Sequence, residues 1–531
     1  MSSPQLVDLS SPDFAAAVAP LVSQGTSFIS DINASFVLTS GYLVFMMQLG
    51  FALLTVGLVR TRSVKSICLK NIIDASAGGI GYWLFGWAFA YGDPFYVDDN
   101  GSTVYQSNAF IGSQQFAMSD FDQFNYYKWL FQFVFAISTA TIISGAVAER
   151  MKFQAYLLYA FFLTAWVYPV LTHWVWSPTG WASPTRVTGP LLLGSGAYDT
   201  VGSGAVHMVG GLAAGAGAWV LGPRTGRFIN GKPQPMPGHN SVFFMSGVLL
   251  LWFGFYGFNP GTMGQIINPD GSHFAEVVAR CAISTSLGGC FGGVVALMQY
   301  FVVTKIRTGR SVWDLHQAGN GALCGMIVIT SGCGTFEPWA AAVGGIVGGM
   351  VYLPSSLFFL HIVKLDDVVD ATTVHGTCGC LGVLWEALLS KQGFVEQIYG
   401  TTNPDGITPR HYGWWQGDNA TVLGANVIWI LAMTGWTLGM MVPFFYALKL
   451  LGQLRVSPEE EMAGVDASHH GGAAYLDDMS EGSTKGGLMY NDASYGFKDS
   501  NEEMSKRLVA METEMRSLRK LVAQHDGNGK A

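Results

Sequence analysis

Long apolar segments recur along this chain and limit what it can fold into. About 20 apolar residues cross the hydrocarbon core of a bilayer as a helix, because a helix satisfies its own backbone polar groups there. Only 12% of the 531 residues are charged, which is low for a soluble protein of this length. The sequence therefore predicts an all-α integral membrane protein with eleven transmembrane helices, at 35–59, 71–92, 125–148, 153–177, 200–221, 240–259, 274–304, 312–331, 337–362, 369–390 and 420–452.

Basic residues predict the orientation, because Lys and Arg are retained in cytoplasmic loops. One set of alternate loops carries thirteen Lys and Arg residues, whereas the opposite loops and the adjoining span ends carry five. The N-terminus is thus expected outside the cell and the C-terminus in the cytosol. Three N-x-S/T sequons, at Asn33, Asn100 and Asn419, fall on the expected outer side.

The charged residues are unevenly spread, which divides the chain into regions. The 78 residues from 454 to the end hold 23 of the 64 charged residues. Apolar residues three and four apart near the C-terminus, from Met504 to Val522, favour a short coiled coil, with a surface helix or a partner site as alternatives. We expect an extracellular segment at 1–34, a transmembrane domain at 35–452, a cytosolic tail motif at 453–472, a flexible linker at 473–500, and an amphipathic or coiled-coil helix at 501–525.

Two expected spans each contain one histidine in a similar setting. Asp199 precedes Val-His207 in the fifth span, and Asp370 precedes Val-His375 in the tenth, and glycines follow both histidines. Because five spans separate the two copies, the second enters the membrane from the other side. This predicts two inverted five-helix repeats plus a final helix, with function near the midplane.

The histidines and the acidic residues each admit two interpretations. A neutral imidazole has one donor and one acceptor nitrogen, so two touching rings suit a proton relay or a small polar solute. The alternative is an imidazole that simply bonds a neighbouring helix. Asp199 and Asp370 stand near helix starts, where capping, the helix dipole and anchoring of the helix account for a carboxylate, and direct solute contact is the alternative.

Several motifs in order resemble the ammonium transporter (Amt/Mep/Rh) family, most closely its plant- and alga-type branch. The resemblance covers about residues 40–472. It implies a homotrimer in the plasma membrane with one conduction path through each subunit. The motifs are those around His207 and His375, together with Gly145-Ala-Val-Ala-Glu-Arg150, His173-Trp-Val-Trp176 and Leu251-Trp-Phe-Gly-Phe-Tyr-Gly-Phe258-Asn-Pro-Gly-Thr262.

The resemblance also implies which residues handle the substrate, ammonium or its analogue methylammonium. An outer site recruits the cation, a pair of phenyl rings forms a gate, and the two histidines line the path for ammonia. Net charge transfer is expected, because the histidine pair offers a proton route. The residues are Trp176, Phe135, Thr262 and Phe255 for recruitment, Phe135 and Phe258 for the gate, Gln132 beside the gate, and His207 and His375 for the pore. Thr262 stands where the family usually has Ser, Phe255 where it commonly has Trp, and Thr55 is not assigned to the site.

The segment from Leu454 to Asp466 resembles the cytosolic tail of plant-type members, which docks on a neighbouring subunit. Ser468 stands where that tail carries a phosphorylatable Thr, which implies a regulatory kinase. A phosphate would add about −1.5 to −2 charge to an acidic segment. The alternative is an ordinary exposed serine.

Other functions are less consistent with the sequence. A sensor with little transport is the main alternative, although the tail is too small for a large output domain. An intramembrane enzyme would need a third metal ligand near the histidines, and none is evident. No cofactor and no metal is expected, and the seven cysteines, Cys378 and Cys380 among them, fit packing. No run of Lys or Arg indicates nucleic-acid binding.

Overall fold

The computed structural model describes residues 12–98, 103–106 and 108–475. This part of the chain is mostly helical. It also has two short antiparallel sheets in loops, β1 (Phe95–Val97) with β2 (Thr103–Tyr105) and β3 (Phe228–Ile229) with β4 (Lys232–Pro233). The expected helix at 501–525, and the expected linker from 476 onward, lie outside the described residues.

Eight helical segments in the described part are long and apolar enough to cross a membrane. The other three expected spans coincide with helices that are shorter or more polar: α2 with α3, α10, and α12 with the π turn before it. The main helices are α1 (Pro12–Leu58), α2 (Val64–Gly81), α3 (Trp87–Tyr91), α4 (Tyr126–Ala146), α5 (Phe153–Phe162), α6 (Tyr168–Trp176), α7 (Val209–Leu221), α8 (Ser241–Gly261), α9 (Ala275–Thr308), α10 (Leu315–Thr330), α11 (Pro338–Leu357), α12 (Cys378–Leu389) and α14 (Thr421–Leu450).

The N-terminal part of α1 differs from the prediction. The helix runs for 47 residues from Pro12, so most of the expected segment 1–34 is helical and continuous with the first span. Its first turns are rich in alanine, which favours a helix without being apolar enough to mark a span. Three short helices were also not expected: α13 (Gln392–Tyr399), α15 (Pro458–Ala463) and α16 (Val465–His469).

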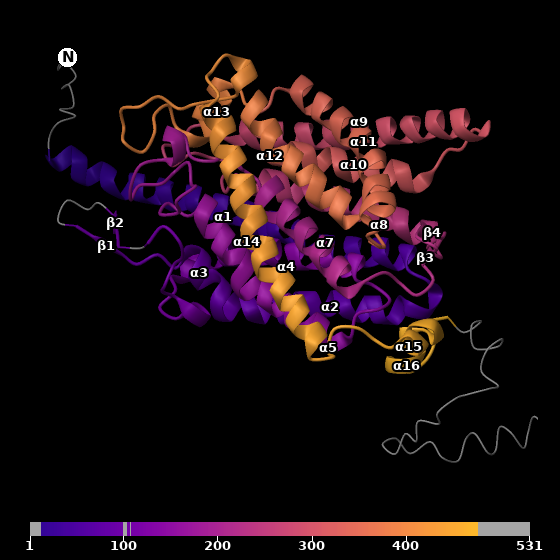
Figure 1. The fold of residues 1–531 in the computed structure, drawn as a ribbon. Helices are drawn as coiled ribbons and strands as arrows, with labels where there is room; N and C mark the ends of the chain where they lie inside the picture. The colour runs from indigo at the N-terminus through magenta and orange to yellow at the C-terminus, as the bar shows by residue number, and fades with distance from the viewer. Residues whose placement is uncertain (1–11, 99–102, 107, 476–531) are drawn as a thin grey trace, which may run out of the picture. The chain divides into compact units, whose positions relative to one another are not determined.

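The helices of the two halves pack tightly against one another. The first helices of the halves, α1 and α8, lie side by side, and a Cβ added at Gly57 would stand 2.4 Å from the backbone nitrogen of Phe244. Small residues permit such close approach of helices in lipid. The last long helix, α14, packs along α7 and α12 and runs in yellow-orange across the middle of Figure 1.

Candidate functional site

The two histidines meet in the interior. His207 lies in a π-helical turn (Ser203–Met208) ahead of α7, and His375 in another (Thr372–Thr377) ahead of α12. Their Nδ1 atoms are 3.2 Å apart, and the two side chains are buried. Since one nitrogen of such a contact must donate and the other accept, the rings share one proton. The Nε2 atom of His207 has no hydrogen-bond partner within the described part of the chain.

Glycine allows this contact. A Cβ added at Gly211 would lie 2.0 Å from the backbone nitrogen of Gly376 and 2.4 Å from its Cα atom. Gly211 stands one helical turn after His207, and Gly376 directly follows His375. The backbones that carry the histidines therefore touch at this point, which fixes the distance between the imidazoles.

A pair of stacked phenyl rings closes one side of the histidine pair. The ring centroids of Phe135 in α4 and Phe258 in α8 are 3.9 Å apart, and both side chains are fully buried. Phe258 lies 5.4 Å from the ring of His207, and Trp176 lies 6.3 Å from Phe135. Phe255, expected among the recruitment residues, instead stacks on His207 at 5.6 Å and is 1% exposed.

A cavity of about 210 Å³ lies near the gate, and we call it the outer cavity after its expected orientation. Thr262 and Gln132 line it, and the Oε1 atom of Gln132 is buried without a hydrogen-bond partner among the described residues. Trp176 is not among the residues that line this cavity. Its indole N–H donates to the backbone oxygen of Asp199 at 2.9 Å. The rest of the lining was not assigned by the sequence analysis, and it includes Phe131, Trp87, Tyr91 and Lys128. Only Phe131 had a usable signal, because it stands one turn before Phe135 on α4.

Asp199 caps the helix that carries His207. Its carboxylate accepts backbone N–H groups of Gly204 at 3.1 Å and Ala205 at 2.7 Å. It also accepts the hydroxyl of Ser331 at 2.8 Å and the indole N–H of Trp429 at 3.3 Å. Four donors thus surround this buried carboxylate, as capping requires.

Asp370 does not cap its helix, in contrast to the prediction. Its carboxylate accepts the hydroxyl groups of Tyr352 at 2.9 Å and Ser356 at 3.1 Å, both from α11. Asp367 caps the helix instead, because it accepts the backbone N–H of Thr372 at 2.7 Å. Asp370 therefore connects two helices of the second half.

An inner cavity of about 20 Å³ lies on the side of His375 away from the gate. This is enough for about one water-sized molecule. Its polar lining consists of Thr55, Thr141, Asn320 and His375, and the ring of Phe51 lies 5.9 Å from that of His375. Thr55, which the sequence analysis left unassigned, thus lines this cavity beside His375.

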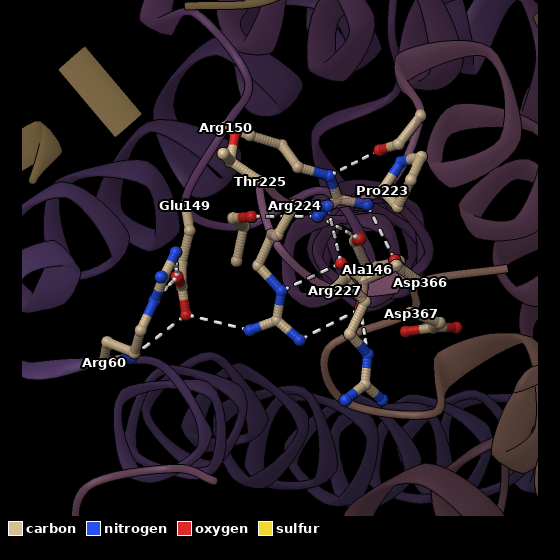
Figure 2. Close-up of polar contacts among 12 residues, drawn as sticks. Arg60, Ala146, Glu149, Arg150, Pro223, Arg224, Thr225, Arg227, Asp366 and Asp367 are labelled. Atoms are coloured by element: carbon tan, nitrogen blue, oxygen red, sulfur yellow. Dashed lines mark hydrogen bonds and ion pairs between the residues drawn. The ribbon is translucent and has the colours of Figure 1, made fainter. Parts of the chain in front are cut away.

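A cluster of arginines and carboxylates joins four of the segments between long helices, as Figure 2 shows. Glu149, from the conspicuous Gly145–Arg150 motif, accepts from Arg60 and from Arg224, the latter at 3.1 Å. Asp366 pairs with the guanidinium of Arg224 at 2.9 Å. Burial alone would raise the pKa of Asp366, but the charges of Arg150 and Arg224 and the hydrogen bonds from Arg224 hold that pKa well below its ordinary value. Asp366 is therefore ionised at neutral pH.

The tail motif packs against loops of its own chain. The carboxylate of Glu461 accepts the backbone N–H of Thr225 at 2.7 Å and its hydroxyl at 3.0 Å. Asp466 accepts the backbone N–H groups of Lys65 and Ser66, each at 2.8 Å, at the start of α2. The tail thus holds two of the loops that the arginine–carboxylate cluster also joins.

Comparison with known proteins shows the family. The model of the Ammonium Transporter Family matches residues 34–475. The chain belongs to the ammonium transporter family. It is 42% identical over 457 residues to ammonium transporter 1 member 3 of Solanum lycopersicum, which covers 85% of this chain and 94% of that protein. It is also 42% identical over 500 residues to ammonium transporter 1 member 1 of Oryza sativa, covering 91% and 95%.

Solved structures share the fold. A protein described as "Sensor Amt Protein" superposes with a TM-score of 0.69 at 26% identity, covering 84% of this chain and 99% of that one. Candida albicans Mep2 superposes with a TM-score of 0.67 at 23% identity, covering 81% and 87%. Ammonium transport across a membrane is therefore the function of this chain, and it is not an enzyme. The sensor alternative is not favoured, because relatives with 42% identity to this chain are named ammonium transporters.

Proposed function

We propose that this ammonium transporter works in the plasma membrane as a homotrimer, with eleven spans and a separate path in each subunit. The N-terminus lies outside and the C-terminus in the cytosol, which agrees with the distribution of basic residues. The matching π turns at His207 and His375 support two inverted five-helix repeats, α1 to α7 and α8 to α12, with α14 as the final helix.

The proposed path begins in the outer cavity, where Thr262 and Gln132 meet the arriving ammonium ion, and Trp176 offers its ring beside the gate, 6.3 Å from that of Phe135. Cation–π contact and hydrogen bonding suit a partly desolvated ammonium ion at such a site. The stacked phenyl gate then opens to let the substrate pass. The observation that carries the proposal is the 3.2 Å contact of His207 and His375 directly behind that gate.

The apolar gate gives selectivity against potassium and sodium. Every bare cation loses several kcal/mol or more of hydration there, since no ring of carbonyl groups replaces its water. Ammonium can leave a proton behind and cross as neutral ammonia. Because His207 and His375 share a proton, the released proton follows along the imidazoles, and transport carries net charge. The alternative is that the imidazoles only line the path for ammonia.

Reconstitution of the full chain in liposomes tests this proposal. We expect uptake of labelled methylammonium together with an ammonium-dependent current. His207→Ala and His375→Ala should each reduce the current at least about tenfold, because general acid–base groups contribute factors of this size or more. His361→Ala, at an exposed histidine after α11, is the matched control and should keep the current. Uptake without any current would contradict net charge transfer, and absence of uptake would contradict the transport path.

Phosphorylation of Ser468 is proposed to switch transport off. The side chain is exposed in α16, and its hydroxyl donates to the backbone oxygen of Gly464 at 3.1 Å. A phosphate there would stand two residues from Asp466, whose carboxylate holds the start of α2. The added negative charge repels that carboxylate and weakens tail packing.

The test compares Ser468→Asp with Ser468→Ala in the full chain. Ser468→Asp is expected to lower ammonium uptake several-fold, whereas Ser468→Ala keeps the exposed surface uncharged and leaves uptake unchanged. Normal uptake by Ser468→Asp would remove the switch from the proposal.

A further inference from the structure

The inner cavity matches the outer one under the inverted repeat. In that repeat α8 is the counterpart of α1, α10 of α4, and α11 of the helix that ends in α6. Thr262 directly follows α8, and Thr55 lies near the end of α1. Gln132 lies in the second turn of α4, and Asn320 in the second turn of α10. The two cavities therefore present the same kinds of group, a hydroxyl and an amide, on opposite sides of the histidine pair.

An aromatic residue also recurs on both sides. Trp176 ends α6 and donates to the backbone of Asp199. On the other side of the histidine pair, Tyr352 in α11 donates from its hydroxyl to the carboxylate of Asp370 at 2.9 Å. Asp199 and Asp367 are the matching caps of the two halves, so Asp370 is an additional carboxylate on the side of His375.

The hydrogen bonds fix how Asn320 faces the inner cavity. The Tyr352 hydroxyl donates its hydrogen bond to the carboxylate of Asp370, so the tyrosine oxygen can only accept from other groups. The side-chain NH₂ group of Asn320 donates to that oxygen at 2.7 Å. The carbonyl oxygen of the amide is then the group that remains for a guest in the cavity that Asn320 lines. An acceptor is what a guest rich in N–H groups requires.

The size and charge of the inner cavity suit the same guest. Its volume of about 20 Å³ admits one water-sized molecule, and ammonium is of that size. The ring of Phe51 adds a π face beside His375. The negative charge of Asp370 lies two hydrogen bonds away from the cavity, through Tyr352 and Asn320.

We propose that Asn320, oriented by Tyr352 and Asp370, forms with Thr55 and His375 a second ammonium-binding site on the side of the histidine pair away from the gate. The site rests on the proposed path through the histidines. It binds ammonium that arrives from the tail side of the membrane, and it sets the concentration dependence of transport from that side.

The experiment measures ammonium-dependent currents in excised membrane patches that contain the full chain, with ammonium applied to one face at a time. Asn320→Leu removes the acceptor at similar volume, and Tyr352→Phe removes only the hydroxyl that orients Asn320. Asn320→Leu should raise the ammonium concentration for half-maximal current from the tail side about tenfold, since a hydrogen bond to a charged group contributes this much. Tyr352→Phe should raise it by a smaller factor.

The gate side supplies the control. Both variants should leave the half-maximal concentration from the gate side within about twofold, whereas Thr262→Val should change the gate side alone. The inner site would be overturned if Asn320→Leu changed the half-maximal ammonium concentration equally from both sides. It would also be overturned if Tyr352→Phe changed that concentration from neither side. Absence of current from either side in the unmodified protein would contradict the proposed path instead.

Discussion

Replacement of Gly211 by alanine is expected to reduce ammonium transport about 100-fold. The new Cβ would stand 2.0 Å from the backbone nitrogen of Gly376, where no atom of that size fits, so α7 must move away from the second histidine helix. His207 and His375 move with these backbones, and their 3.2 Å contact then exceeds hydrogen-bonding distance. A displacement of about 1 Å is enough for a loss of this size where reacting groups must be aligned.

A matched glycine separates this effect from a general intolerance of alanine. Gly435 lies in α14, and a Cβ added there meets no atom within 4 Å. Gly435→Ala should transport ammonium normally and keep its unfolding temperature. Gly211→Ala should also be less stable, by about 1–3 kcal/mol of overpacking strain. Liposome uptake per folded protein, with thermal unfolding measured in parallel, decides the matter. Uptake by Gly211→Ala within twofold of the unmodified chain would show that the helix contact does not set the histidine distance.

Eight of the eleven expected spans coincide with helices of the described part that are long and apolar enough to cross a membrane, because lipid imposes a minimum apolar length on each span. The apolar-length criterion placed the start of the first span at residue 35, because it detects only the apolar part of a helix. The helix α1 itself begins earlier, at Pro12. The histidine pair was also predictable, because each histidine directly follows a valine near the start of an apolar span, with an acidic residue before it and glycines after it. Inverted repeats bring such residues together near the midplane.

Other parts of the site depend on details that the sequence does not contain. Phe255 and Phe258 stand three residues apart on α8, so periodicity alone does not say which of them faces the recruitment side. Asp367 and Asp370 are equally close, and helix starts read from sequence are accurate to only a few residues. The cap was therefore assigned to Asp370, although Asp367 provides it. The contact of Asn320 with Tyr352 joins two different helices, and no motif marks it.

Loss of the Asp199 carboxylate is expected to have an equally large effect. Asp199→Ala leaves four donors without an acceptor: the N–H groups of Gly204 and Ala205, the hydroxyl of Ser331 and the indole of Trp429. Each buried unsatisfied group costs about 1–3 kcal/mol. The turn that carries His207 then loses its cap, so transport should fall about 100-fold and the unfolding temperature should drop clearly.

Asp199→Asn distinguishes capping from a direct effect of the negative charge on ammonium. Asparagine keeps one acceptor oxygen, so this variant should lose about half as much stability as Asp199→Ala. The four donors already surround the carboxylate, which leaves no lone pair for a cation, and we therefore expect transport by Asp199→Asn to follow its remaining folded fraction. Asp367→Asn, at the cap of the helix that carries His375, is the control. Its transport should likewise fall in proportion to its remaining folded fraction. Loss of the cap alone would lower stability and transport together. If Asp199→Asn folded as stably as the unmodified chain yet failed to transport, the charge of Asp199 would therefore act on ammonium itself.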